Sequence, residues 1–177
     1  MAAEKLVSTE FVFKGRAVNL RVDTVEMPGG RRTTREIVEH PDCVAIVPVD
    51  AQGNVLLVRQ YRHATGKELL EIPAGGIDPG EDPETAVRRE MSEETGFSPR
   101  TVKRLGGFYS SPGFCTEYLH LFLAADLVPH PLVAEDTDSI HVVKVRPEDI
   151  EGLIKSEAIR DSKSIAGIYT YLRTIGS

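Results

Sequence analysis

One arginine and three glutamates lie close together in the segment REMSEET at residues 89–95, directly behind a glycine-rich loop. Arg89, Glu90, Glu93 and Glu94 have the spacing that puts side chains on one face of an α-helix. Converging carboxylates repel each other by roughly 0.2–0.5 kcal/mol per adjacent pair, and a bound cation would reverse that repulsion. Carboxylate oxygens suit Mg²⁺ or Mn²⁺, and Mg²⁺ is usually held by carboxylates together with substrate phosphates. The segment therefore predicts a site for a divalent metal and a pyrophosphate, in which Arg89 pairs with Glu93.

The residues before this helix favour a site over the alternative, which is a solvated acidic helix face. Asp82 is suited to cap the helix, and Pro83 is suited to its first position. The residues ahead of them are those of a tight loop: Pro73, Gly75, Gly76, Pro79 and Gly80. The start of the helix is therefore well marked, with the loop running straight into it.

The full pattern over residues 75–97 is G-x5-E-x7-R-E-U-x-E-E-x-G-U, where U is a bulky apolar residue, and every fixed position matches. This pattern resembles the signature of the Nudix hydrolases. The resemblance implies an α/β/α sandwich with a mixed sheet and hydrolysis of a diphosphate linked to another group. It also implies Mg²⁺, with Mn²⁺ as an alternative and more than one ion, held by the carbonyl of Ala74 and by Glu90, Glu93 and Glu94.

Segments flanking the signature resemble the ADP-ribose pyrophosphatase branch of that family. These segments are residues 35–40, 59–62, 71–75 and 111–114. The last of them contains Pro112. A proline at this distance past the signature is the usual marker of the branch. The resemblance implies that Arg62 contacts the diphosphate, that Glu36 meets the adenine and that Glu117 meets the terminal ribose. Further candidates for substrate binding are Arg35, Arg59, Pro112 and Phe114.

Part of this assignment also follows from charge. Arg59 and Arg62 lie on a basic strand in a protein whose formal net charge is −6, and guanidinium groups bind phosphate oxygens in bidentate fashion. The same net charge argues against a nucleic acid as partner. Phe114 could either stack on a substrate or pack within the protein.

The catalytic base is the least determined residue of the site. In the ADP-ribose branch it comes from an acidic loop close to D-E-D-E-x-I-E-V, and the corresponding stretch here is EDTDSIHV at residues 135–142. Glu135, Asp136 and Asp138 are the candidates in this loop. Glu93 is the alternative base, since other Nudix branches use that position.

Three functional hypotheses follow. The first is Mg²⁺-dependent hydrolysis of ADP-ribose to AMP and ribose 5-phosphate. The second is a broader nucleoside diphosphate sugar pyrophosphatase, which the altered acidic loop suggests. The third is a non-catalytic Nudix-fold nucleotide sensor, against which the intact carboxylate cluster argues.

The surrounding elements divide the chain into two expected domains. Residues 1–40 alternate like strands around a turn at Pro28, Gly29 and Gly30, which predicts an N-terminal antiparallel sheet. Such a small sheet has little core of its own, so we expect it to form a homodimer. Residues 41–177 form the expected Nudix domain, with a hairpin at 44–58 and two closing helices that begin near Arg146 and Asp161.

Composition is that of a globular chain, with 41% hydrophobic and 27% charged residues. No apolar run approaches the roughly 20 residues of a membrane span, and the N-terminus lacks the apolar core of a secretion signal. We therefore expect a cytoplasmic protein without membrane contact, whose Cys43 and Cys115 are reduced and buried.

Overall fold

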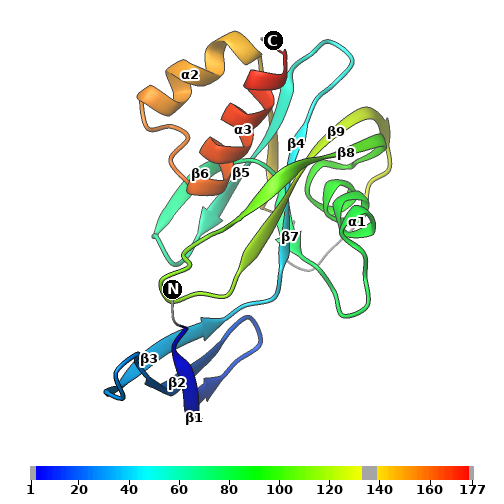
Figure 1. Ribbon diagram of the computed structural model, residues 1–177. Helices are drawn as coiled ribbons and strands as arrows, with labels where there is room; N and C mark the ends of the chain where they lie inside the picture. The colour runs from blue at the N-terminus through cyan, green and yellow to red at the C-terminus, as the bar shows by residue number, and fades with distance from the viewer. Residues whose placement is uncertain (1–2, 133–138, 176–177) are drawn as a thin grey trace. The chain divides into compact units, whose positions relative to one another are not determined.

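The computed structural model describes residues 3–132 and 139–175 (Figure 1). The chain forms two compact units. The first comprises Met1–Asp42 and Tyr109–Tyr118, and the second comprises Cys43–Phe108 and Leu119–Ser177. Within the described residues, no helix is both long enough and apolar enough to cross a membrane.

The first unit is a three-stranded antiparallel sheet. Its strands are β1 (Lys5–Lys14), β2 (Asn19–Glu26) and β3 (Arg32–Glu39), paired in that order. The turn between β2 and β3 contains Gly29 and Gly30, whose φ angles of 99° and 83° lie in the left-handed region that glycine tolerates. Segment 109–118 lies along β3, because the Val38 amide donates to the Phe114 carbonyl at 2.7 Å. The predicted N-terminal antiparallel sheet is confirmed.

The second unit contains two sheets and three helices. One sheet has the order β7-β4-β9-β8, with β4 parallel to β9 and antiparallel to β7, so it is mixed. The other has the order β10-β5-β6 and is antiparallel. The strands are β4 (Cys43–Pro48), β5 (Val55–Arg62), β6 (Lys67–Glu71), β7 (Ala74–Gly76), β8 (Phe97–Tyr109), β9 (Tyr118–Pro129) and β10 (His141–Val145).

The expected hairpin between β4 and β5 is wrong. A turn does connect them, in which Asp50 Oδ1 accepts from the amides of Gln52 and Asn54, but only an isolated bridge joins Val49 to Val55. Beyond that bridge, each strand belongs to a different sheet. β4 and the first half of β5 are apolar and buried on both faces, and each strand is central in its own sheet instead of pairing with the other.

The helices α1 (Pro83–Thr95), α2 (Pro147–Lys155) and α3 (Ser162–Ile175) cover the mixed sheet on its two faces (Figure 1). Alternation along β4 explains the two layers, since successive side chains on a strand point to opposite faces. Val44 and Ile46 pack in a buried cluster with Ala86, Val87 and Met91 of α1. Ala45 and Val47 pack in another cluster with Ile150 of α2 and Ile168 and Tyr171 of α3. The predicted α/β/α sandwich with a mixed sheet is thereby confirmed.

Neither cysteine forms a disulfide bond. Cys43 is buried as expected, but Cys115 is half-buried, so the expected burial is wrong for Cys115.

Candidate active site

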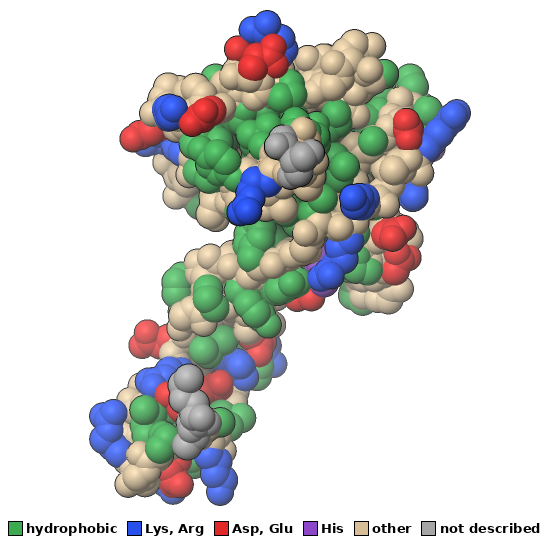
Figure 2. All heavy atoms as spheres, turned by 45° about the horizontal axis from the view of Figure 1, so that its top comes forward, with side chains coloured by type: hydrophobic (Ala, Val, Ile, Leu, Met, Phe, Trp, Pro, Cys, Tyr) green, Lys and Arg blue, Asp and Glu red, His purple; other side chains and the backbone are tan. Residues whose placement is uncertain are grey.

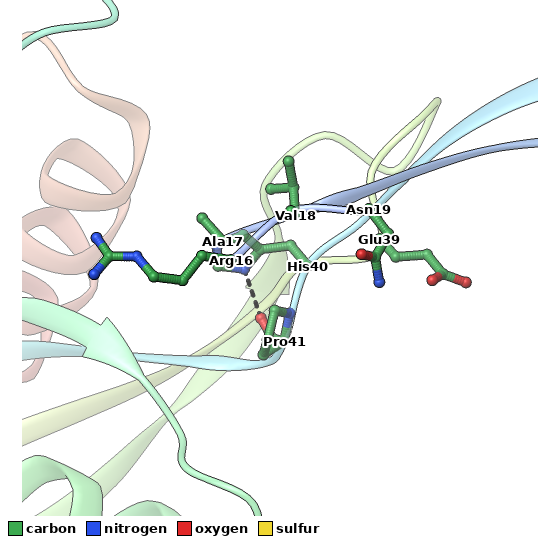
Figure 3. Close-up of a pocket in the computed structure, with 8 residues that line it drawn as sticks. Arg16, Ala17, Val18, Asn19, Glu39, His40 and Pro41 are labelled. Carbon is green, nitrogen blue, oxygen red and sulfur yellow. Dashed lines mark hydrogen bonds between the residues drawn. The ribbon is translucent and has the colours of Figure 1, made fainter. Parts of the chain in front are cut away.

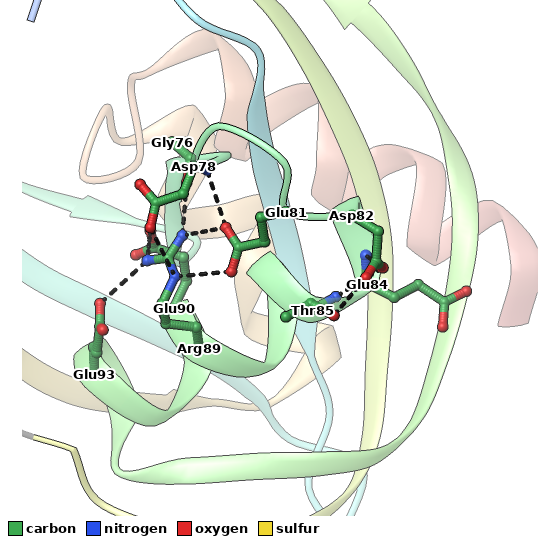
Figure 4. Close-up of polar contacts among 9 residues, drawn as sticks. All are labelled: Gly76, Asp78, Glu81, Asp82, Glu84, Thr85, Arg89, Glu90 and Glu93. Carbon is green, nitrogen blue, oxygen red and sulfur yellow. Dashed lines mark hydrogen bonds and ion pairs between the residues drawn. The ribbon is translucent and has the colours of Figure 1, made fainter.

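Arg89 of α1 is the centre of a network of oxygen acceptors (Figure 4). Its Nη1 contacts Glu90 Oε1 at 2.6 Å and Glu93 Oε2 at 3.4 Å. Its Nε and Nη2 donate to the two carboxylate oxygens of Glu81 at 3.0 and 2.9 Å, and Nη2 also donates to the Gly76 carbonyl at 2.8 Å. The predicted Arg89–Glu93 pair is present, but Glu81 and Glu90 lie closer. The planar guanidinium thus sets the orientation of three glutamates at once.

Local capping fixes the loop and the start of α1. Asp82 adopts an extended conformation and its Oδ1 accepts from the amides of Glu84 and Thr85 at 3.0 and 3.1 Å, while Pro83 occupies the first turn. In the preceding loop, the Asp78 amide donates to Glu81 Oε2 at 3.0 Å. Glu81 therefore links the loop to Arg89, so loop and helix hold one geometry.

Gly75 allows the backbone of β7 to approach the carboxylate of Glu90 closely. A Cβ atom at this position would lie 2.1 Å from Glu90 Oε1, a distance that real Cβ contacts do not show. Glu90 itself is buried, with 8% relative exposure. Burial raises its pKa, and the opposing effect of Arg89 does not cancel this.

Glu94 is the second carboxylate of the cluster with a raised pKa, and it is half-buried. Its Oε2 accepts a hydrogen bond from the Ala74 amide at 3.2 Å, which brings together two of the predicted metal ligands. Burial, followed by repulsion from Glu90, raises the pKa of Glu94 to about 8. Glu90 and Glu94 are desolvated carboxylates whose ionisation is unfavourable while they lie side by side. The backbone also approaches Glu90 more closely than a Cβ atom would permit. Both features fit a divalent cation held by oxygen ligands. Glu90, Glu94 and Ala74 are the residues that would hold it.

Arg62 lies at the end of β5 in a second ionic network. Its Nε and Nη2 donate to the two oxygens of Glu71 at 2.9 and 2.8 Å, and Lys163 of α3 donates to the same carboxylate. Burial alone would raise the pKa of Glu71, but the bonds and charges of these two cations outweigh it, so its pKa lies below the usual value. Arg59 is exposed and lies on the opposite face of the strand, three positions away. The two predicted arginines therefore do not act as one pair.

The other predicted substrate-binding residues belong to the first unit. Arg35 pairs with Glu4 at 2.5 Å, whereas its neighbour Glu36 is exposed on the other face of β3. Phe114 is 55% exposed, and Glu117 lies 3.7 Å from His40 Nδ1. With Pro112, these residues gather on β3 and the segment beside it.

A cavity of about 260 Å³ also lies in the first unit (Figure 3). In it the His40 ring bonds the Pro41 carbonyl at 2.7 Å. None of the predicted substrate-binding residues lines it. Its lining residues are Gly15, Arg16, Ala17, Val18, Asn19, Glu39, His40 and Pro41.

Three of the four candidate bases, Glu135, Asp136 and Asp138, lie outside the described residues. Glu93 is described and half-buried, and it contacts Arg89.

Sequence reasoning assigned no role to Glu71 or Lys163. Glu71 carries a signal, because it opens the segment 71–75 that leads into the signature. Lys163 carries none, since it is 92 positions from Glu71 and no motif in the sequence links the two residues.

Comparisons with known proteins agree with this geometry. The NUDIX domain family matches residues 39–167, and the nucleoside diphosphate sugar hydrolase N-terminal domain matches residues 4–38. An ADP-ribose pyrophosphatase of Bacillus subtilis is 36% identical over 167 residues, which cover 93% of this chain and 90% of that protein. A GDP-mannose pyrophosphatase of Escherichia coli is 34% identical over 154 residues, which cover 81% of this chain and 79% of that one.

A crystal structure of an ADP compounds hydrolase superposes with a TM-score of 0.91 at 22% sequence identity, covering 99% of this chain and 96% of that one. This likeness concerns the fold. The family match, in contrast, spans most of the chain and includes the whole network around Arg89. This protein therefore belongs to the Nudix hydrolase family.

Proposed function

We propose that this protein is a Mg²⁺-dependent pyrophosphatase that hydrolyses ADP-ribose to AMP and ribose 5-phosphate. The observation that carries the proposal is the pair of carboxylates with raised pKa values, buried Glu90 and half-buried Glu94, in the same unit as the phosphate-binding candidate Arg62. The hydrogen bonds to Glu71 are the main reason why the pKa of Arg62 is raised, and the negative charge of Glu94 adds to this effect. The Bacillus subtilis relative, which is named an ADP-ribose pyrophosphatase, supports this choice of substrate.

The residues of the site have separable roles in this proposal. When bound, the metal neutralises phosphate charge and lowers the pKa of a coordinated water. Arg89 orients Glu90 and Glu93, and Arg62 binds a phosphate oxygen through its remaining donors. The bonds from Arg62 to Glu71 use Nε and Nη2, and among the described residues Nη1 has no protein acceptor.

Hydrolysis forms a bond between the water oxygen and one phosphorus and breaks the bridging P–O bond, so a base must accept the proton of the water. Glu93 is the candidate base among the described residues, and its contact with Arg89 would fix its position. Glu135, Asp136 and Asp138 remain candidates for the same role. Changing each of the four to its amide would identify the base as the single variant with a large loss of kcat.

A second candidate function is hydrolysis of a broader set of nucleoside diphosphate sugars. The N-terminal match to the nucleoside diphosphate sugar hydrolase domain and the GDP-mannose pyrophosphatase relative favour it. The two candidates differ in the nucleoside and the sugar that the substrate carries. A hexose nucleotide preferred over ADP-ribose by more than about tenfold in kcat/KM, or roughly 1.4 kcal/mol, would select the broader activity.

We also propose that the protein is a homodimer formed through the first unit. Every residue of β1 is exposed, including large apolar side chains at 42–59% relative exposure: Leu6, Val7, Phe11, Val12 and Phe13. Hydrophobic side chains reach the surface of this unit among charged ones in Figure 2. An exposed apolar edge strand is a ready pairing surface for a second copy. A cytoplasmic location stays a prediction.

Product analysis tests the leading proposal. The purified protein would be incubated with ADP-ribose with and without Mg²⁺, beside ADP-glucose, UDP-glucose, GDP-mannose, NADH and diadenosine polyphosphates. We expect AMP and ribose 5-phosphate only in the presence of the metal. Tight binding of ADP-ribose without product in Mg²⁺ would instead support a nucleotide sensor.

A further inference from the structure

We propose that Lys163, at the start of the C-terminal helix α3, is a positioning residue that holds Arg62 in place for substrate binding through the shared carboxylate of Glu71. The proposal rests on the proposed role of Arg62 at the diphosphate. Lys163 is not assigned a contact with substrate, and its effect would pass through two other side chains.

Glu71 is the centre of the arrangement. Its side chain is 1% exposed, and it accepts from Arg62 with both oxygens and from Lys163 with Oε2. The side chain of Lys163 is 16% exposed, whereas that of Arg62 is 40% exposed. Arg62 is therefore the member of the trio that faces solvent and can meet a ligand, while Lys163 and Glu71 lie behind it.

Asp161 fixes Lys163 from the other side. Its Oδ1 accepts from Lys163 Nζ at 2.9 Å and from the Ser164 amide at 3.0 Å. Asp161 therefore orients the ammonium group and also caps the first turn of α3. The ammonium is thus held between two carboxylates. Two cations and two anions balance in this network, and loss of Lys163 would leave an excess negative charge beside the group that must attract a phosphate.

Ser164, the residue after Lys163 in α3, binds Ile72, the residue that directly follows β6. Ser164 Oγ accepts from the Ile72 amide at 2.8 Å, inside the core. Gly167 permits the close contact, because a Cβ atom there would lie 2.9 Å from Ile72 Cδ1 and 3.0 Å from Leu121 Cδ1. Adjacent residues of α3 therefore bind the adjacent pair Glu71 and Ile72.

The chain that follows Glu71 and Ile72 leads directly to the proposed metal ligands. Two positions after Ile72, the Ala74 amide donates to Glu94. The start of α3 thus controls one short segment that bears the partner of Arg62 at one end and a contact to Glu94 at the other. A buried ionic network is a poor way to gain stability, since apolar residues of similar volume often do as well or better. The charges of this network are better explained by their effect on the position of the Arg62 side chain.

Steady-state kinetics of Lys163→Met with ADP-ribose and Mg²⁺ test the proposal. We expect KM to rise about tenfold and kcat to change by less than about threefold, which is the pattern of lost binding rather than lost chemistry. Lys163→Arg should restore KM to within about threefold of the wild type, because it restores the cation. The matched control is Lys155→Met, which removes the same charge from a lysine that is 73% exposed and paired with Glu151 on α2, and its KM should be unchanged.

A double-mutant cycle separates positioning from a direct or merely structural role. In an Arg62→Gln background, Lys163→Met should raise KM no further, since its effect passes through Arg62. If the increases in KM from Arg62→Gln and Lys163→Met multiplied in the double variant, the proposal would be overturned. A Lys163→Met variant with a lowered Tm but the KM of the wild type would overturn it as well. Binding of ADP-ribose without metal supplies a second readout, in which Kd of Lys163→Met should also rise about tenfold. If the wild type hydrolyses ADP-ribose while Lys163→Met matches it, this inference alone fails; if the wild type neither binds nor hydrolyses it, the proposed function fails too.

Discussion

At the residue scale, the surroundings of Glu94 fit its proposed role as a ligand of a divalent cation. Burial and the neighbouring Glu90 raise its pKa from 4.5 to about 8. Between these two pH values Glu94 keeps a proton in the folded protein that it has lost in the unfolded chain. The free energy of unfolding therefore falls as the pH rises through this window, in the absence of metal. Carboxylates with a lowered pKa, such as Glu71 and Glu81, have the opposite effect at acidic pH. Their contribution to stability is lost as the pH falls and they become protonated.

We predict that Glu94→Gln removes much of this pH dependence. In metal-free buffer, the melting temperature of the wild type should fall from pH 5 to pH 8, and that of the variant should fall less. Thermal melts at several pH values with a chelator present would measure this. Addition of Mg²⁺ at pH 8 should raise the melting temperature of the wild type more than that of the variant, because the variant lacks one of the proposed charged ligands and binds the ion more weakly. Equal slopes for both proteins would contradict a raised pKa at Glu94.

The same substitution should nearly abolish turnover. Glu94→Gln removes a charge and hardly any volume, so we expect kcat to fall by at least about 10²-fold while the fold is kept. The Ala74 amide still finds an oxygen acceptor in glutamine, which limits structural damage. Circular dichroism beside the kinetic assay would check that the fold is intact. Unchanged turnover would exclude Glu94 as a metal ligand.

Gly75 offers a test that leaves every carboxylate in place. In Gly75→Ala the new methyl group would collide with Glu90, so that side chain must move. Displacement of a catalytic group by about an ångström costs on the order of 10²-fold in rate, and we expect a loss of kcat of that size. The matched control is Gly76→Ala, where a Cβ atom meets nothing within 4 Å, and its kcat should stay near the wild-type value. Equal activity of the two variants would contradict the close approach at Glu90.

At the element scale, the start of α1 was predictable because its signals are local. Asp82 and Pro83 mark it in the sequence, and Gly96 ends it with a φ of 76°. The partners of β4 and β5 were not predictable, because the apolar runs show only that each strand is buried. Lys163 also escaped sequence reasoning, since its role depends on a contact across 92 positions. Spacing along the chain identifies groups on one helix, but it cannot identify which distant helix faces them.

The cap of α1 gives a prediction at this scale. Asp82→Ala removes the acceptor for the Glu84 and Thr85 amides and should cost about 0.5–2 kcal/mol of stability. For a chain of this length, that corresponds to a fall in melting temperature of about 2–4 °C per kcal/mol. Asp82→Asn should retain most of the stability, because asparagine caps equally well. A melt in which both variants behave alike would show that the side-chain cap does not contribute.

At the scale of the whole molecule, the acidic balance of the chain makes the local cations decisive. A protein with a formal net charge of −6 repels a nucleotide diphosphate, so binding must come from a few groups that overcome this background. Arg62 is the predicted phosphate contact in the second unit, and divalent metal would add to it. High salt should therefore weaken substrate binding only modestly, because screening reduces the general repulsion as well as the local attraction.

The proposed dimer supplies the last prediction. β1 exposes apolar side chains along its whole length, and a three-stranded sheet of this size buries little core, so a second copy would cover surface that is costly to leave in water. Phe13→Asp places a charge on this strand at a side chain that is 57% exposed, and it should shift the protein from dimer to monomer in sedimentation equilibrium. Tyr169→Asp, at a position in α3 that is 41% exposed, introduces the same charge on the second unit and should leave the dimer intact. A wild type that sediments as a monomer would contradict the proposed dimer, and a Phe13→Asp variant that stays dimeric would place the interface away from β1. A monomeric variant that keeps full turnover would show that each copy holds a complete site.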